Sequence, residues 1–291
     1  MSAPASQIPR APEARSSREL PLTVIRPARG WAHPQLGDLW NYRELIGFLT
    51  WRDISVRYKQ TVFGVAWAVI QPFFTMVVFS IFFGHLAKIG SDGVPYPIFS
   101  YAGLLPWQFF SYSLTQSGNS LVANQNLVSK VYFPRLAIPI AVVLAGLVDL
   151  VVASSVLAGM MVWYGITPPP QIVLLPLFVL LAIATSVGVG LWLSALAVEY
   201  RDVQYVIPFL LQFWLFVTPI AYPASIVPAG YRFLLGLNPM AGVVEGFRWT
   251  ILGTDSAPGP LILVSIAVTL LLLVTGLFHF RRMEATFADR I

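Results

Sequence analysis

One carboxylate stands inside an otherwise apolar run, Asp149 in the stretch LAGLVDLVVASS. A carboxyl group in such a run can relay protons when a transporter is driven by an ion gradient. It can also accept hydrogen bonds from Ser, Thr or backbone groups where two helices touch. Gly146, Ala153, Ser154 and Ser155 are small enough to allow that close contact. The residues alone leave both roles open.

Groups for covalent or hydrolytic chemistry are sparse. Glu199 and Asp202 flank Arg201 in a short turn, which favours an ionic network over a catalytic pair. The chain has no Cys and three scattered His, so we expect no metal site and no disulfide. A phosphate-binding loop needs Gly-Lys followed by Ser or Thr, and no Gly-Lys dipeptide occurs. We therefore expect neither an enzyme nor a chain that itself binds cofactors such as ATP and magnesium.

Aromatic side chains, at 14% of the chain, gather in two apolar stretches. Ring faces can stack on the C–H faces of sugars, while Ser, Thr, Gln and Asn exchange hydrogen bonds with hydroxyl groups. The same rings could instead form a belt at the membrane interface or pack between helices. The residues predicted to line a conduit are Trp107, Phe110, Tyr112, Gln116, Phe209, Phe213, Trp214 and Phe216.

The elements that must position these groups are membrane spans. The chain is 57% hydrophobic and 11% charged, whereas about a quarter of the residues are charged in an average soluble domain. Five apolar stretches have the roughly 20 residues that a bilayer demands of a helix, and a sixth, 98–122, is weaker because it contains SYSLTQSGNSLV. We predict an all-α integral membrane protein with six transmembrane helices. The spans are 62–83, 98–122, 136–163, 171–198, 203–222 and 260–280.

The basic residues support one orientation of these spans. With the N-terminus inside, fifteen of the 18 Lys and Arg residues fall on the cytoplasmic side, and only Lys88, Arg232 and Arg248 fall outside. Both termini are therefore expected in the cytoplasm. The net charge of +5 is explained by this topology, and we expect no binding to nucleic acid.

The segments outside the spans differ in character. Residues 1–35 are rich in Pro, Ala, Ser and Arg, which predicts a disordered cytoplasmic tail and no secretory signal. Residues 36–60 carry two apolar stripes at helical spacing, typical of an amphipathic interface helix that contacts lipid alone or lipid and a partner. The first stripe is Tyr42, Leu45, Ile46 and Leu49, and the second is Phe48, Trp51, Ile54 and Tyr58. Residues 223–253 are too apolar for a free loop and too interrupted to span, which predicts short external re-entrant helices. Within the first span, Pro72 predicts a kink.

Five blocks of the chain carry a family likeness. They are WRDISVRYKQTVFGVAWAVIQP, YAGLLPWQFF, NLVSKVYFPRLAIP, YRDVQYVIPFLLQFWLFVTPIAYP and LNPMAGVVEGFRW. In order and spacing they resemble the membrane subunit of ABC-type exporters of bacterial polysaccharides, especially lipopolysaccharide O-antigens. The resemblance implies a permease in the bacterial inner membrane, acting as a homodimer with two copies of a separate ATPase that binds ATP and magnesium. The implied cargo is a lipid-linked polysaccharide.

The resemblance also implies roles for particular residues. Segment 126–135 is similar to the coupling helix that docks into the ATPase, and the interface helix would touch the ATPase as well. The implied docking residues are Asn126, Leu127, Lys130, Val131, Tyr132, Phe133, Pro134, Arg135, Arg52, Arg57 and Lys59. Segment 223–253 is similar to the external gate helices, for which the implied residues are Tyr222, Tyr231, Asn238, Pro239, Glu245 and Arg248. Asn238 and Pro239 would begin the second gate helix, and Glu245 and Arg248 could pair on one face of it.

Three other functions stay open at this point. The same mechanism could export a capsular or teichoic-acid polymer. An ion-driven secondary transporter would use Asp149, and a membrane glycosyl or acyl transferase would act on a lipid-linked donor without an ATPase.

Overall fold

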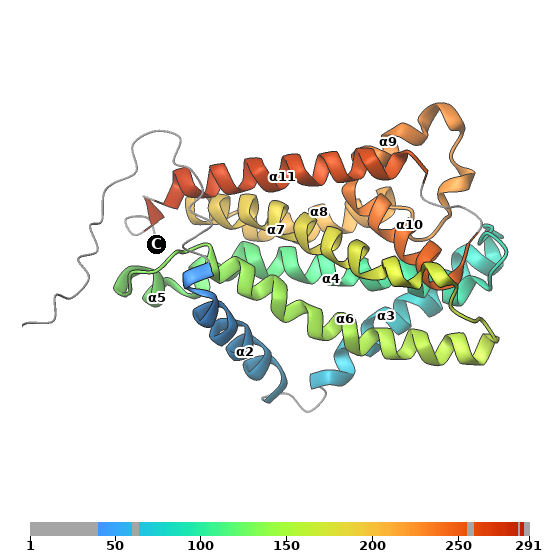
Figure 1. The fold of residues 1–291 in the computed structure, drawn as a ribbon, viewed down its shortest axis with the longest axis horizontal. Coiled ribbons are helices and arrows are strands. Elements are labelled where there is room, and N and C mark those ends of the chain that lie inside the picture. Colours follow the sequence, from blue (N-terminus) through green and yellow to red (C-terminus); the bar gives the residue numbers. More distant parts are fainter. Residues whose placement is uncertain (1–39, 60–63, 255–258, 285, 288–291) are drawn as a thin grey trace, which may run out of the picture.

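The structure is a computed structural model that describes residues 40–59, 64–254, 259–284 and 286–287. Within these ranges the chain is helical and forms no strand. Its long helices run side by side in an elongated bundle (Figure 1). The predicted tail 1–35 lies outside the described residues.

The predicted spans correspond to helices of the bundle. The first contains α3 (Gly64–Phe79), which continues into a π-helical stretch at Ser80–Leu86. The others are α4 (Tyr96–Ala123), α6 (Ala137–Tyr164), α7 (Leu175–Glu199) after a 3-10 turn at Pro170–Leu174, α8 (Val203–Val217) and α11 (Leu261–Glu284). Four of these segments, Ala66–Leu86, Ala137–Tyr164, Pro170–Glu199 and Leu261–Glu284, are long and apolar enough to cross a membrane.

Helix α4 is the centre of the bundle. It has 28 residues and packs against α3, α6, α7, α8 and α10. Its polar second half is largely covered by the protein, since Ser113, Ser117 and Ser120 are buried. The weak apolar character of 98–122 therefore reflects a helix whose surroundings are other helices, where polar side chains do not meet hydrocarbon.

Helix α8 is shorter than the predicted span 203–222. It has 15 residues and ends at Val217, and residues 218–222 form a turn in which Thr218, Pro219 and Ile220 are buried. Pro219 has no amide hydrogen to continue the helix, and the carbonyl groups freed by the break find partners elsewhere in the protein. The helix thus ends five residues before the predicted end of this span.

Helices α7 and α11 approach each other closely at two glycines. A Cβ atom at Gly188 would lie 2.8 Å from the backbone nitrogen of Leu273, and one at Gly276 would lie 2.5 Å from the carbonyl oxygen of Gly188. Only a residue without a side chain allows this approach, which is typical of helix pairs in membranes.

Buried apolar side chains form a cluster at one end of the bundle, and we name it the end cluster. Its buried members include Leu49 of α2 (Arg43–Lys59), Val128 of α5 (Gln125–Lys130), Leu136, Phe280 and Phe287. Tyr42, Leu45 and Ile46 also pack against it, so the first predicted stripe of the interface helix is the one that faces the protein. From the second stripe, Phe48 and Trp51 are exposed.

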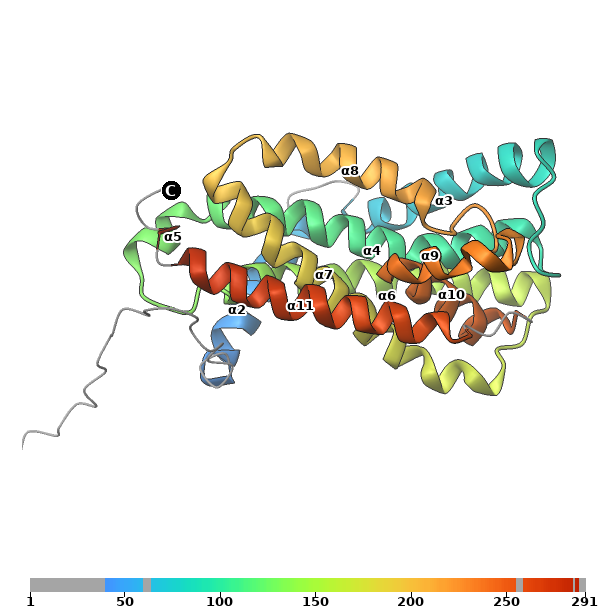
Figure 2. The ribbon, with the colours of Figure 1, turned by 90° about the horizontal axis from the view of Figure 1, so that it is seen from above.

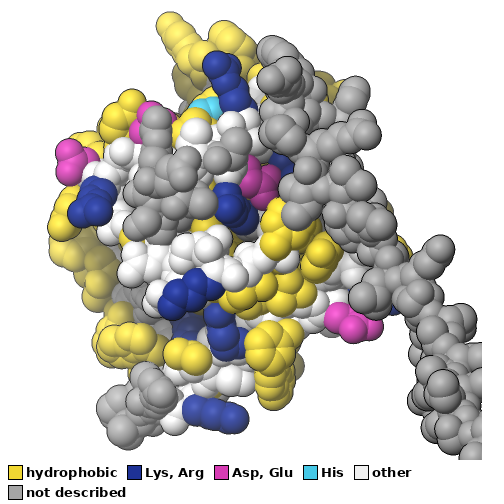
Figure 3. Space-filling view, turned by 90° about the vertical axis from the view of Figure 1, so that its left-hand side faces the viewer, with side chains coloured by type: hydrophobic (Ala, Val, Ile, Leu, Met, Phe, Trp, Pro, Cys, Tyr) yellow, Lys and Arg dark blue, Asp and Glu magenta, His cyan; other side chains and the backbone are white. Residues whose placement is uncertain are grey.

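The two ends of the bundle hold different features: one carries basic side chains, and the other is built from short helical elements. The end that holds α5 also holds the last turn of α11 with Arg281 and Arg282, and Figure 3 shows Lys and Arg side chains spread over it. The opposite end holds short elements: the 3-10 turns Ala224–Ile226 and Ala229–Tyr231, then α9 (Arg232–Leu237) and α10 (Pro239–Leu252). Figure 1 places α9 and α10 at that opposite end.

Candidate functional site

The predicted docking segment forms a short helix followed by an exposed turn. Helix α5 covers residues 125–130, and 131–136 continue as a turn instead of a helix. Asn126, Lys130, Val131 and Tyr132 are exposed, whereas Phe133 is buried in the end cluster. The exposed tip of the segment is therefore apolar and basic, and the buried side chain of Phe133 attaches the segment to the bundle. Leu127 and Pro134 are half-buried.

Arg135 is engaged within the chain. Its backbone N–H donates to Glu284 Oε1 at 3.0 Å, and its guanidinium donates to the carbonyl oxygen of Glu284. Glu284 also accepts from Arg281, at 3.0 Å. Arg135 thus fastens the docking segment to the end of α11, while Lys130 is the exposed cation of this segment.

The three basic residues proposed on α2 lie in different surroundings. Arg52 pairs with its neighbour Asp53 at 2.8 Å, a contact within the helix, and Lys59 is exposed. Arg57 instead points into the bundle, where its guanidinium pairs with Asp149 of α6 and lies 4.1 Å above the ring of Tyr112 of α4.

Asp149 therefore has a partner that its neighbours in sequence did not reveal. Besides Arg57, the Tyr58 hydroxyl donates to its carboxylate. The partners are a phenol and a cation instead of the Ser, Thr or backbone groups considered from the sequence, because helix α2 packs against α6 and brings Tyr58 and Arg57 to the carboxylate. Burial, together with the hydrogen bond to Asp149, raises the pKa of Tyr58 well above its usual range, so the phenol stays a donor.

The predicted channel residues separate into two groups. Trp107 and Phe110 are buried inside the chain at 4% and 0% exposure, and Trp214 packs edge-on against Phe110 with 5.1 Å between ring centroids. Tyr112 is half-buried under Arg57. These four side chains serve packing between helices in this structure. Phe209, Phe213, Phe216 and Gln116 are exposed.

Helices α8 and α3 both carry exposed aromatic residues. Figure 2 shows α8 and α3 along the same edge of the bundle, beside α4. We name the aromatic surface after its seven exposed members, which are Trp67, Phe73, Phe74, Tyr205, Phe209, Phe213 and Phe216. The predicted lining residues include none from α3, although the first span was expected to border the channel together with the fifth.

Asn238 organises the start of α10. Its Oδ1 accepts the backbone N–H of Met240 at 3.1 Å and the indole N–H of Trp214 at 2.9 Å. Its Nδ2 donates to the hydroxyl of Thr218 at 2.9 Å. Pro239 occupies the first helical turn, as is common after such a cap. The predicted start of this helix is confirmed, and one side chain joins α10 to the end of α8.

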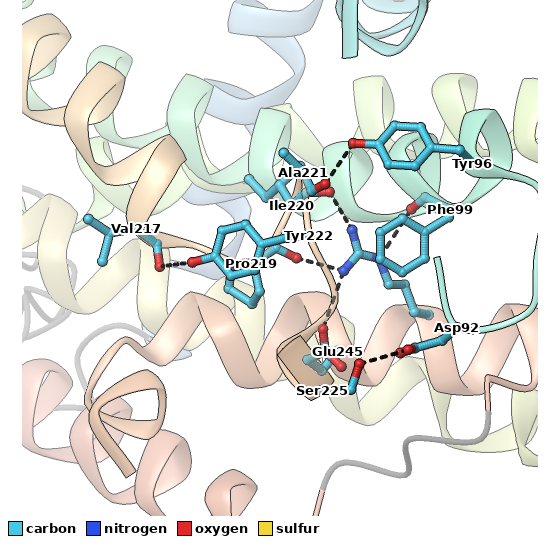
Figure 4. Close-up of polar contacts among 11 residues, drawn as sticks. Asp92, Tyr96, Phe99, Val217, Pro219, Ile220, Ala221, Tyr222, Ser225 and Glu245 are labelled. Carbon is cyan, nitrogen blue, oxygen red and sulfur yellow. Dashed lines mark hydrogen bonds and ion pairs between the residues drawn. The ribbon is translucent and has the colours of Figure 1, made fainter. Parts of the chain in front are cut away.

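Arg248 is the most buried charged side chain among the described residues, at 1% exposure. Its Nη1 and Nη2 donate to the carbonyl groups of Pro219 and Ile220 at 2.6 and 2.5 Å, and its Nε donates to that of Phe99 at 3.1 Å (Figure 4). The guanidinium thus donates hydrogen bonds to carbonyl groups that have no helical partner because α8 has ended. It also excludes any side chain at Gly103, where a Cβ would lie 2.6 Å from Nη2.

Glu245 and Arg248 form the predicted pair, at 3.3 Å. The pair is buried instead of lying on the surface. Burial lowers the pKa of Arg248 to about 10, an effect that Glu245 opposes, so the guanidinium is charged at neutral pH. Burial raises the pKa of Glu245, and Arg248 opposes that shift.

The other two predicted gate residues are peripheral to this pair. Tyr222 is half-buried with its hydroxyl near the carbonyl groups that end α8, and Tyr231 is exposed. A mostly apolar cavity of about 440 Å³ lies between α9, α10 and the start of α11, with Glu245 and Arg232 among its lining residues. No three His, Asp or Glu side chains among the described residues come together as a metal site would require.

Similarity to known proteins agrees with this architecture. Residues 44–252 match the family described as ABC-2 type transporter. The O-antigen export system permease protein RfbA of Myxococcus xanthus is 30% identical over 260 residues, which cover 87% of this chain and 98% of the relative. Its namesake in Klebsiella pneumoniae is 26% identical over 84% of this chain and 94% of the relative.

A relative whose name gives a different cargo is also similar to most of this chain. The polysialic acid transport protein KpsM of Escherichia coli is 28% identical over 80% of this chain and 91% of the relative. The family match over residues 44–252 includes almost all of α2, the central helix α4, the docking segment and the Asn238 and Arg248 region. From the family match over most of its length, the chain belongs to the ABC-2 type transporter family, as the membrane-embedded permease component.

Proposed function

We propose that this chain is the transmembrane subunit of an ATP-driven exporter that moves a lipid-linked polysaccharide, of the O-antigen type, across the bacterial inner membrane. The observation that carries the proposal is similarity to O-antigen export permeases over almost the full length of both chains. The absence of a phosphate-binding loop from the sequence fits a permease whose ATPase is a separate subunit.

The proposed working unit is a homodimer with two ATPase subunits. The aromatic surface supports a second copy as the partner, because seven large aromatic side chains are exposed on α3 and α8, two helices that lie along the same edge of the bundle. A twofold interface would place this surface of one copy against the same surface of the second copy. Glycan rings could then pass between Phe209, Phe213 and Phe216 of the two copies, where C–H faces stack on the rings.

The exposed tip of the docking segment is the proposed contact with the ATPase. Val131 and Tyr132 offer apolar area, and Lys130 offers a charge. ATP binding would close the two ATPase subunits and move this tip. Because the segment is fastened to α11 by Arg135 and to the end cluster by Phe133, the displacement would reach the packed bundle, which responds by switching between discrete arrangements.

A second cargo is supported by a specific observation. The polysialic acid transport protein is 28% identical over 80% of this chain, and the Klebsiella relative is 26% identical over 84% of it. Export of a capsular polymer by the same mechanism is therefore the alternative, and aromatic stacking accepts both kinds of sugar.

The test is reconstitution of the permease with its ATPase in proteoliposomes, followed by measurement of ATP-dependent movement of a lipid-linked O-antigen. We expect export with the ATPase and none without it. Because the chain has no Cys, Phe213→Cys can report the interface by disulfide formation between copies, with Val162→Cys, exposed on α6, as the matched control. Export without ATP, or cross-linking through Val162 alone, would contradict the proposal.

A further inference from the structure

The C-terminal turn of α2 is held by a polar cluster that joins three helices. Arg57 and Tyr58 from α2 meet Asp149 from α6, and Arg57 also lies over the ring of Tyr112 from α4. Exposure of the Arg57 side chain is 33% and that of Asp149 is 15%. We name these four residues the polar anchor.

Asp149 lies near the middle of α6, a helix of 28 residues. At 1.5 Å per residue it is roughly 20 Å from either end of that helix. An isolated carboxylate at such a depth is unfavourable, so its partners must be brought to it. Helix α2 supplies them, because it packs against α6 at an oblique angle (Figure 1) and carries Arg57 and Tyr58 near its C-terminal end.

The two halves of α2 are attached by different chemistry. The N-terminal half is fixed by apolar contacts of Tyr42, Leu45 and Leu49 with the end cluster. In the C-terminal half, Trp51 and Val56 are exposed, and the polar anchor supplies an ion pair and a hydrogen bond to α6 and a ring contact with α4. Loss of the anchor should therefore release the last turns of α2 while the rest of the helix stays packed.

We infer that Asp149 is a positioning residue: through Arg57 and Tyr58 it fixes the C-terminal turn of α2 to α4 and α6, so that the three helices move as one body during transport. The inference rests on the proposed function, because it takes α2 to receive movement from the ATPase. In this role the carboxylate has two partners that hold it in place, and it carries no proton across the membrane.

The test compares Asp149→Asn, Arg57→Gln and the double variant in the full permease–ATPase complex. Spin labels at Val56 and Val151, which are both exposed, report the distance between the end of α2 and α6. Labelled permease is diluted with unlabelled permease so that only distances within one copy contribute. The second readout is glycan exported per ATP hydrolysed.

Both single variants should broaden the distance distribution and lower export per ATP about tenfold, and the double variant should be no worse than either, because the residues act as one contact. Asp149→Glu keeps the charge and should restore most of the coupling. Ser154→Ala, which removes a hydroxyl bonded within α6, should change neither readout. For the distance alone, Arg52→Gln is the matched control, since Arg52 is equally exposed at 33% but pairs inside α2.

Two results would overturn the inference. One is an unchanged, narrow distance distribution in both single variants. The other is complete loss of export in Asp149→Asn with full activity in Arg57→Gln, which would indicate a proton relay. If the parent complex exports no glycan, the proposed function fails, but the distance measurement still decides whether Asp149 positions α2.

Discussion

The guanidinium carbon of Arg248 lies 3.6 Å from the centroid of the Phe99 ring, while its Nε donates to the Phe99 carbonyl group at 3.1 Å. These residues belong to α10 and α4, which are far apart in the chain. The contact joins the end of the bundle that holds α9 and α10 to the central helix. It also places a cation where the end of α8 leaves carbonyl groups without helical partners.

Replacing Arg248 should therefore be costly. Arg248→Met removes the donor to three carbonyl groups and leaves Glu245 buried without its cation, so we expect the free energy of unfolding to fall by about 3 kcal/mol. Thermal unfolding of the purified permease in detergent measures the change. Arg248→Met combined with Glu245→Gln should recover part of the loss. An Arg248→Met variant as stable as the parent would contradict the hydrogen bonds of Arg248 to the three carbonyl groups and its pairing with Glu245.

Asn238 should contribute to stability through its cap. Asn238→Ala removes the acceptor for Met240 and the links to Trp214 and Thr218, and we expect a loss of about 1 to 2 kcal/mol. The same unfolding measurement applies, with Asn126→Ala, an exposed position on α5, as the control for an asparagine outside this network. Equal unfolding temperatures for the two variants would show that the cap has no effect.

The contact between α7 and α11 should not tolerate a methyl group. At Gly188 a Cβ would lie 2.8 Å from backbone nitrogen, so Gly188→Ala should cost about 1 to 3 kcal/mol through forced separation of the helices. Gly159 of α6 is the matched control, because a Cβ there meets nothing within 4 Å. Gly159→Ala should leave stability unchanged or slightly higher. If both variants behave alike, the close approach of α7 and α11 is refuted.

Lys130 and Arg135 should give different results although both are basic residues of the docking segment. Lys130→Glu changes an exposed charge, so capture of the ATPase in co-purification should fall while the unfolding temperature of the permease alone stays the same. Arg135→Glu breaks the contacts with Glu284, so it should lower both. Undiminished capture by Lys130→Glu would remove this residue from the docking surface.

The sequence by itself determined the membrane class and most of the helices. The apolar runs that predict α6, α7 and α11 are long and uninterrupted. In hydrocarbon no water can bond the backbone, so such a run satisfies its own N–H and C=O groups by forming a helix. The cap at Asn238 and Pro239 is likewise a local signal, because capping depends on residues adjacent in the chain. The family blocks indicated the class of transporter, which the comparison with known relatives confirms.

Only the tertiary structure decided which charged and aromatic groups meet. Asp149 looked solitary because its partners Arg57 and Tyr58 lie far away in sequence, on a helix that folds back across α6. The sequence indicated Glu245, one turn before, as the partner of Arg248, whereas the carbonyl groups that surround its guanidinium come from Phe99 and the turn after α8. Trp107 and Phe213 have equally apolar neighbours, yet one is buried and the other exposed. Such distinctions depend on how helices pack, and packing joins residues that no local pattern relates.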